Sequence, residues 1–387
     1  MNILILVHPL TRRWLLPHAL LVALLLAPAV LTAQSGSKTE TFDSIAERAD
    51  QAREASHFDE AVALYKRGVA MRPKWAEGWW SLGMIEYERN NYTGAAHAFR
   101  QLLPLAPKDG TARVMLGLCE FELGHDSAAL KHLEAGKELG VSVNPQLRLV
   151  TLYHEGILLL RGGQFKAAQA SLMSTCAREI RDSEVLRFLG LAYLRVLPKD
   201  APPADSPGND IVLRVGRAGC FTGAKKYDDA TREYAELVKD YPQYPNIHYA
   251  YGRFLVDVND AAAGIDQFKL ELQNQPKDVN SRLEIAAAQY KLDSAAGVPY
   301  AEEAVGLAPQ LPFGHYLLGL LYVDTDHFEK AIPELETAQK AFPKDKRLYL
   351  ALASAYSRVG RKQDAAKARA AFERLNKEST ESGQASY

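Results

Sequence analysis

Residues 76–109 read AEGWWSLGMIEYERNNYTGAAHAFRQLLPLAPKD, and this stretch decides the fold because its pattern returns along the chain. It contains a proline that belongs to a series with intervals of 33 or 34 residues, interrupted by one longer gap. The series is Pro73, Pro107, Pro242, Pro276, Pro309 and Pro343. A fixed period of this length predicts a solenoid, in which one helical hairpin is repeated and stacked.

The residue types within residues 76–109 predict two helices that cross closely. Gly83 and Ala95 are small enough to let two helix backbones approach each other. Leu82 and Phe99 are apolar and recur at helical spacing, so they fill the space around that crossing. Pro107 ends the second helix, because proline has no N–H and its ring clashes with the preceding turn.

This order of residues resembles the tetratricopeptide repeat, whose pattern is W-x2-L-G-x2-Y, then A-x3-F, then P. The match begins at Trp79, and the tyrosine of the pattern is replaced by Glu86. The resemblance extends over most of residues 42–376. It implies an all-α fold, a right-handed superhelical solenoid of about eight or nine helix-turn-helix units.

Charge and composition argue against nucleic acid as a partner. The 387 residues carry a formal charge of −1, and acidic and basic residues alternate along the expected helices. No long basic run is present to bind phosphates, and no interleaving of aromatic and basic residues suggests a base-stacking surface. A protein or peptide partner is therefore the expected ligand, and the oligomeric state stays open.

Residues 1–33 read as an export signal. Arg12 and Arg13 precede an apolar run from Ala19 to Ala33, which is shorter than the ~20 residues needed to span a bilayer. Small residues at the end of the run favour cleavage before Gln34 and a periplasmic or secreted protein. The alternative is an uncleaved signal anchor, which would be the only membrane contact expected.

The rest of the chain divides into five segments in this reading. Residues 34–41 are a polar linker, and residues 42–195 form an N-terminal repeat array. Residues 196–209 are a proline-rich insertion that cannot be helical. The first helix of one repeat is therefore followed by another first helix, with no second helix between them, and we expect a kink in the superhelix there. A C-terminal array with a capping helix occupies residues 210–376, and residues 377–387 form a polar tail that we expect to be disordered.

Motifs for catalysis, cofactors or metals are not evident in the sequence. There is no glycine-rich phosphate loop and no nucleophile elbow, and no histidines have the spacing of a zinc site. We therefore expect no catalytic residue, no cofactor and no metal. Cys119 and Cys220 follow positions that prefer small apolar side chains, and Cys176 lies late in an expected second helix, so we predict three free, structural thiols.

In a solenoid of this kind, the first helices of successive repeats line a concave groove, and binding is expected there. Reading the second, fifth, ninth and twelfth positions of each repeat gives mainly apolar and aromatic residues. The predicted protein-binding residues are Trp80, Met84, Tyr87, Val114, Leu118, Phe121, Tyr153, Ile157, Leu160, Tyr249, Tyr316 and Leu320. The same reading also selects Arg253, Val256, Leu283, Tyr290, Phe313 and Val323, and then turns polar at Arg347, Ser354 and Ser357.

Two interpretations of these residues stay open. In one they bind an apolar segment or helix of a partner. In the other they are internal packing, because a soluble monomer rarely leaves so large an apolar surface uncovered. The first predicts a non-catalytic, exported scaffold, within a cell-envelope assembly or secretion complex. The alternative function is an accessory or regulatory subunit of an envelope enzyme such as a protease or glycosyltransferase.

Overall fold

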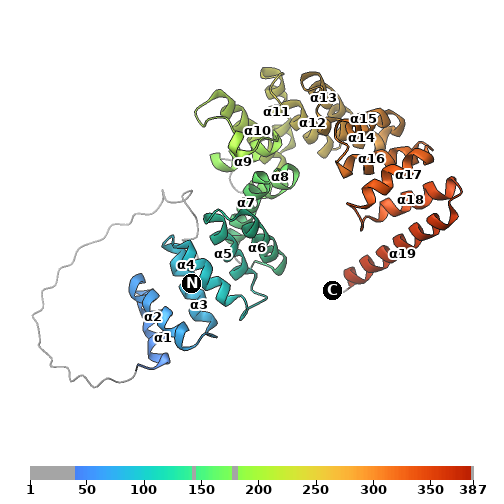
Figure 1. Cartoon of the computed structure of the whole chain (residues 1–387). Helices are drawn as coiled ribbons and strands as arrows, with labels where there is room; N and C mark the ends of the chain where they lie inside the picture. Colours follow the sequence, from blue (N-terminus) through green and yellow to red (C-terminus); the bar gives the residue numbers. More distant parts are fainter. Residues whose placement is uncertain (1–39, 142–144, 177–181, 385–387) are drawn as a thin grey trace, which may run out of the picture. The chain divides into compact units, whose positions relative to one another are not determined.

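The structure, a computed structural model, describes residues 40–141, 145–176 and 182–384. These residues form 19 α-helices and one short 3₁₀-helix, and they contain no strand. The chain divides into two compact units, residues 1–178 and residues 179–387, called unit 1 and unit 2 below (Figure 1). The prediction of an all-α chain of helix-turn-helix pairs is confirmed. The expected signal and most of the expected linker lie outside the described residues.

Unit 1 consists of four helical pairs, in each of which the earlier helix is called the first helix and the later one the second helix. The pairs are α1 (Phe42–Glu54) with α2 (Phe58–Met71), α3 (Ala76–Glu88) with α4 (Tyr92–Leu102), α5 (Gly110–Glu122) with α6 (Asp126–Leu139), and α7 (Pro145–Arg161) with α8 (Phe165–Met173). The crossing of α3 and α4 is as close as the sequence predicts, because a Cβ atom on Gly83 would lie 2.8 Å from the ring of Phe99.

Unit 2 opens with three helices that pack in sequence and continues with four regular pairs. The three are α9 (Ser183–Tyr193), α10 (Pro207–Gly223) and α11 (Tyr227–Asp240). The pairs are α12 (Ile247–Asp257) with α13 (Ala261–Asn274), α14 (Val279–Leu292) with α15 (Ser294–Leu307), α16 (Pro312–Asp324) with α17 (Phe328–Gln339), and α18 (Lys346–Arg358) with α19 (Lys362–Gln384).

The phased prolines have a second role besides ending helices. In four repeats, the residue six positions after the proline donates a side-chain hydrogen bond to the carbonyl oxygen of that proline. The bonds join Trp79 to Pro73 (2.9 Å), His248 to Pro242 (3.0 Å), His315 to Pro309 (2.8 Å) and Tyr349 to Pro343 (3.0 Å). Carbonyls beyond a helix end lack an intrahelical partner. The next first helix supplies one, and the two repeats are thereby joined.

A further polar link between repeats starts from the position that the repeat pattern assigns to tyrosine, called the coupling position here. In α3 and α5 of unit 1 this position holds a buried glutamate, and in the last two repeats of unit 2 it holds tyrosine. Each contacts a side chain of the preceding second helix, 20 residues earlier in the sequence. The pairs are Glu86 with Lys66 (2.8 Å), Glu120 with Arg100, Tyr322 with Glu302, and Tyr356 with Glu336 (2.7 Å).

The start of unit 2 differs from the expectation. α9 and α10 pack directly against each other, and two glycines make this possible. A Cβ atom on Gly190 would lie 1.9 Å from the carbonyl oxygen of Val212, and one on Gly216 would lie 1.8 Å from that of Leu186. The boundary between the compact units falls after Arg178, whereas the sequence leads us to expect a break at residues 196–209, which lie within unit 2.

The proline-rich insertion is also more regular than expected. Pro198–Asp200 form a 3₁₀-helix, and Pro207 lies in the first turn of α10, whose N-cap is Ser206. The expectation that residues 196–209 contain no helix is therefore wrong, because proline is well suited to the first turn, where an N–H would lack a partner anyway. Arg187 from α9 holds the loop by donating to the carbonyl of Pro202 (2.8 Å).

The C-terminal end and the cysteines also correct the sequence reading. α19 reaches Gln384, so the tail that we expect to be disordered from residue 377 is helical over most of its length. Its lysine, glutamate and glutamine residues are good helix formers, which explains the continuation. Cys119 is a buried free thiol, as predicted, but Cys176 and Cys220 are disulfide-bonded.

Candidate functional site

The first helices of unit 2 form a continuous face. α12, α14 and α16 each pack against the next first helix as well as against their own second helix, and α18 packs against α16 and α19. Position along the repeat therefore determines whether a side chain lies between two first helices or on their open side. In unit 1, α5 and α7 pack against each other in the same way.

Eight of the twelve predicted binding residues are buried. They are Tyr87, Val114, Leu118, Ile157, Leu160, Tyr249, Tyr316 and Leu320. The other four are half-buried, namely Trp80, Met84, Phe121 and Tyr153. Burial favours the packing interpretation for the first group. The half-buried four stay candidates for partner contact.

The half-buried aromatic rings of unit 1 are held by their neighbours. The Trp80 ring packs edge-on against Phe99 of α4, with centroids 5.8 Å apart. The Phe121 ring lies 4.6 Å from His154 of α7, and the guanidinium of Arg161 lies 4.8 Å from its centroid. These contacts fix the rings, so a partner could reach only part of each one.

Unit 2 exposes large apolar side chains on three successive first helices. Tyr290 of α14 is 39% exposed, Phe313 of α16 is 42% exposed and Leu350 of α18 is 56% exposed. Tyr316 of α16 is buried and stacks on Phe313 with ring centroids 6.2 Å apart. We call Tyr290, Phe313 and Leu350 the apolar strip. Leu350 is missed in the sequence reading of the last repeat, although it occupies the fifth position, which would have identified it.

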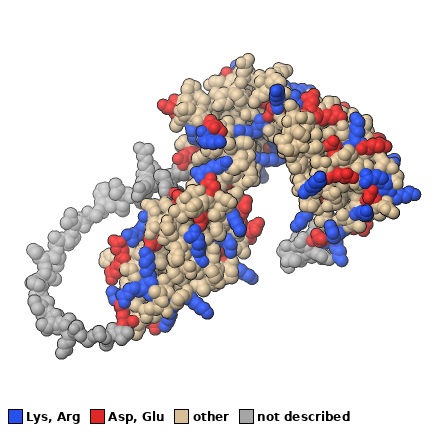
Figure 2. Space-filling model, in the orientation of Figure 1, with Lys and Arg blue, Asp and Glu red and all other residues tan. Residues whose placement is uncertain are grey.

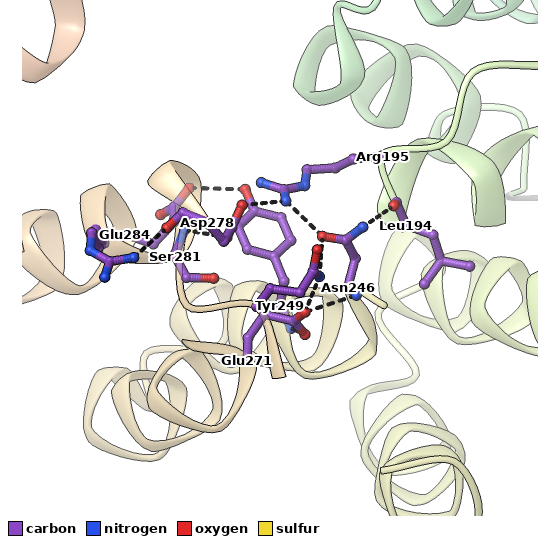
Figure 3. A network of polar contacts seen from close by, with 10 residues as sticks. Leu194, Arg195, Asn246, Tyr249, Glu271, Asp278, Ser281 and Glu284 are labelled. Carbon is purple, nitrogen blue, oxygen red and sulfur yellow. Dashed lines mark hydrogen bonds and ion pairs between the residues drawn. The ribbon is translucent and has the colours of Figure 1, made fainter. Parts of the chain in front are cut away.

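A network of polar contacts joins α9 to the first regular repeats (Figure 3). Arg195 follows α9 with a positive φ of 56° and extends toward Asn246 and Asp278. Its Nη2 atom donates to Asn246 Oδ1 and to Asp278 Oδ1, both at 2.6 Å. Its guanidinium also lies 4.3 Å from the ring centroid of Tyr249. This geometry combines an ion pair with a cation–π contact.

Glu271 completes the polar network from the second helix of the same pair. Its fully buried carboxylate accepts the backbone N–H groups of Asn246 (2.9 Å) and Tyr249 (3.1 Å). These are unpaired N–H groups at the start of α12, so Glu271 caps that helix from α13. Asn246 in turn donates to the carbonyl of Leu194 (2.8 Å). The network therefore attaches the end of α9 to α12 and α14.

Charge balance within the network explains the ionisation of Asp278. Burial acts to raise the pKa of this carboxyl, but Arg195 and the N–H of Ser281 outweigh it, so the pKa is lowered. Burial also raises the pKa of Tyr249. Each charged group has a protein partner, although Arg195 Nε and Nη1 are buried without one. The network is a structural joint, and it coincides with the irregular region predicted from the sequence.

A metal-binding cluster is not found in the described residues. Among the residues that the structure describes, no cluster of three or more His, Cys, Asp or Glu side chains could hold a metal ion. No helix in the described parts of the chain is both long enough and apolar enough to cross a membrane. The apolar strip is thus the surface that calls for a functional explanation.

Comparison with known proteins identifies the repeat. A family model described as "Tetratricopeptide repeat" matches residues 47–110, 86–140, 223–279 and 316–379, which together exceed half of the chain. No curated protein matches. Solved structures of similar fold include "Crystal structure of MamA", which is 19% identical with a TM-score of 0.40, and the alignment covers 42% of this chain and 96% of that one.

Two further structures are similar at lower identity. "Crystal structure of YrrB: a TPR protein with an unusual peptide-binding site" is 14% identical with a TM-score of 0.38, covering 50% of this chain and 92% of that one. A tetratricopeptide repeat protein from Parabacteroides merdae is 14% identical with a TM-score of 0.32, covering 72% and 98%. Paired helices, small residues at their crossings and a family match over more than half of the sequence agree: the chain belongs to the tetratricopeptide repeat family.

Proposed function

We propose that this protein is an exported, non-catalytic scaffold that binds segments of other proteins on the first-helix face of unit 2, within a cell-envelope assembly or secretion complex. The observation that carries the proposal is the apolar strip. Tyr290, Phe313 and Leu350 are exposed on three consecutive first helices. Single exposed apolar residues need no explanation, but a row of them on one face is typical of an interaction site.

Two observations support export. The N-terminal sequence has a basic pair, a short apolar run and small residues at its end, which is the composition of a secretory signal. Cys176 and Cys220 are disulfide-bonded, and disulfides persist mainly in oxidising compartments outside the cytoplasm. A matched family of binding repeats and the lack of a metal cluster among the described residues agree with a scaffold rather than an enzyme.

The experiment compares what tagged full-length variants capture from the envelope fraction of the source cells. The double variant Phe313→Ala with Leu350→Ala should lose partners that the wild type retains. Because both side chains are exposed, its thermal stability should stay near that of the wild type. The matched control, Met71→Ala with Leu139→Ala, removes exposed apolar side chains that lie on second helices of unit 1.

The outcomes separate the proposals. Captured structural subunits that depend on Phe313 and Leu350 support an assembly scaffold, and a captured envelope enzyme supports the accessory-subunit alternative. Partners lost equally in the Trp80→Ala and Phe121→Ala variants would place binding in unit 1 instead. Identical capture by the wild type and the Phe313/Leu350 variant would contradict binding at the apolar strip.

A further inference from the structure

The C-terminal end of unit 2 is strongly basic, although the chain as a whole is not. Residues 344–378 contain ten Lys or Arg residues and four Asp or Glu residues, whereas the whole chain has a formal charge of −1. Several of these basic side chains lie over the end of unit 2 in the view of Figure 2. The excess positive charge therefore lies in α18, α19 and the turn between them.

Two of the basic side chains lie beside the apolar strip. Arg347 occupies the second position of the last first helix, its side chain is 77% exposed, and its guanidinium lies 6.0 Å from the ring centroid of Tyr316. Arg369 is on α19, yet its Nη2 atom donates to Ser357 Oγ at the twelfth position of α18 (3.4 Å). These two cations thus mark the two ends of the α18 face that carries Leu350.

Neither arginine is neutralised by a close carboxylate hydrogen bond. Arg347 Nη2 forms an ion pair with Asp345 Oδ2 at 3.7 Å, which is longer than a hydrogen bond, and Asp345 Oδ1 accepts the N–H groups of Arg347 (2.8 Å) and Leu348 (3.3 Å) at the start of α18. Arg369 is exposed, and its described partner is a hydroxyl. Both guanidinium groups can therefore donate hydrogen bonds to the carboxylate of a partner, for which their planar arrangement of donors is well suited.

We propose that this end of the first-helix face binds an acidic segment of a partner protein, with carboxylates paired to Arg347 and Arg369 and apolar side chains covering Leu350, Phe313 and Tyr290. The inference rests on the proposed function and adds the chemistry of the partner. Charge complementarity sets the occupant: the site offers two cations around an apolar surface, so it fits a segment that alternates acidic and apolar residues.

An anionic membrane is the competing occupant, and the arrangement of side chains disfavours it. Helices that lie in a bilayer interface combine basic residues with large apolar side chains on one helix. Between residues 362 and 378, where side-chain exposure is described, α19 exposes no large apolar residue. The exposed apolar groups lie instead on α14, α16 and α18, across three helices, as a partner segment running along the face would require.

The test uses the full-length protein and a display library of random peptides of about twelve residues, a length that spans several repeats. Peptides selected on the wild type are synthesised and their affinities measured by fluorescence anisotropy. The test variant is Arg347→Glu with Arg369→Glu, and the control is Lys226→Glu with Lys239→Glu at the two ends of α11. Circular dichroism melts of both variants check that these substitutions of exposed residues leave the fold intact.

We expect selected peptides rich in acidic and apolar residues, with affinity that falls at least about tenfold in the Arg347/Arg369 variant and stays unchanged in the control. Their affinity should also fall as NaCl rises from about 0.05 to about 0.3 M. Selected peptides without acidic enrichment, or with equal affinity for both variants, would overturn this inference while leaving groove binding intact.

Two other results would also count against it. If the library yields no binders, both the inference and the proposed function fail. If no acidic peptide is selected but vesicles of phosphatidylcholine and phosphatidylglycerol bind the wild type and not the Arg347/Arg369 variant, the basic end is a membrane-binding surface and the acidic-segment proposal is overturned.

Discussion

Replacement of Arg195 by Ala should destabilise the start of unit 2 and leave unit 1 unchanged. Arg195 is 13% exposed and its partner Asp278 is 7% exposed, so the pair is largely shielded from water. Removing one member of such a pair costs about 3–5 kcal/mol, because the other charge stays buried without compensation. Asp278 keeps the Ser281 N–H (2.8 Å), and two unpartnered N–H groups of Arg195 are removed with the side chain.

The expected net loss in the free energy of unfolding is therefore about 2–4 kcal/mol. Arg195 has φ = 56°, a conformation that costs alanine as much as arginine and glycine much less. Arg195→Gly should consequently be about 1 kcal/mol more stable than Arg195→Ala, although both lose the same contacts. Arg195→Met combined with Asp278→Asn should recover most of the loss, because no buried charge remains.

The pH dependence gives an independent check. In the wild type the pKa of Asp278 is lowered, so its pairing contributes stability above the ordinary pKa of 3.8 and loses it as pH falls through the folded-state value. Without Arg195, only the Ser281 hydrogen bonds oppose the effect of burial, so the pKa of Asp278 should be higher than in the wild type. The deficit of the Arg195→Ala variant should therefore be largest near neutral pH and shrink below about pH 4.

The assay can separate the units, because all four tryptophans lie before residue 81 and none lies in unit 2. Tryptophan fluorescence during urea unfolding reports unit 1, and hydrogen exchange measured by peptide mapping reports α9–α14. We expect lost protection in α9–α14 with an unchanged fluorescence transition. Equal loss of protection throughout both units, or a change under about 0.5 kcal/mol, would refute the view of the network as a buried joint.

Three further outcomes are expected. Gly216→Ala should destabilise unit 2 by more than ~3 kcal/mol in a melt, because its Cβ would meet a backbone carbonyl at 1.8 Å, while Gly314→Ala should cost far less. His315 contacts Glu334 and the carbonyl of Pro309, and these bonds raise the pKa of His315 although burial opposes them. The wild type should therefore be more stable than His315→Gln below pH 6.5, and this difference should be lost as pH rises through the folded-state pKa of His315. N-terminal sequencing of the exported protein should begin near Gln34, and a membrane-bound product that retains Trp14 would show an uncleaved anchor.

The repeat fold could be predicted because its determinants are local and recur. The close crossing at Gly83 and Ala95 and the ending of helices by the phased prolines are both visible in one repeat and recur in the next. The pairing of α9 with α10 could not be predicted in the same way. It depends on Gly190 and Gly216, two glycines far apart in sequence that permit close approach only once both helices exist. Pro207 predicts a break in helical structure when it is taken alone, whereas in the structure it lies in the first turn of α10.

The binding surface was harder to predict, since exposure depends on how far neighbouring helices overlap. Positions such as Val114 and Leu118 have the period of a groove, but both side chains are buried in the core of unit 1. Leu350 has the same repeat position as Val114 and is exposed, on α18, the last first helix of the array. Periodicity therefore identifies the face, and the end of the array determines which part of it remains accessible.

The coupling positions have a consequence for how the order of repeats is kept. In unit 1 a basic residue of the second helix pairs with a glutamate of the next first helix, as Lys66 pairs with Glu86. At the end of unit 2 the second helix supplies the acid, as Glu302 does for Tyr322. A chain in which the second helix carrying Glu302 was followed by the first helix carrying Glu86 would replace the cation beside the buried Glu86 by a carboxylate, at a cost of several kcal/mol. Duplication or exchange of repeats is thus tolerated within each end of the protein and penalised between the ends, which gives the array a direction that recombination cannot easily reverse.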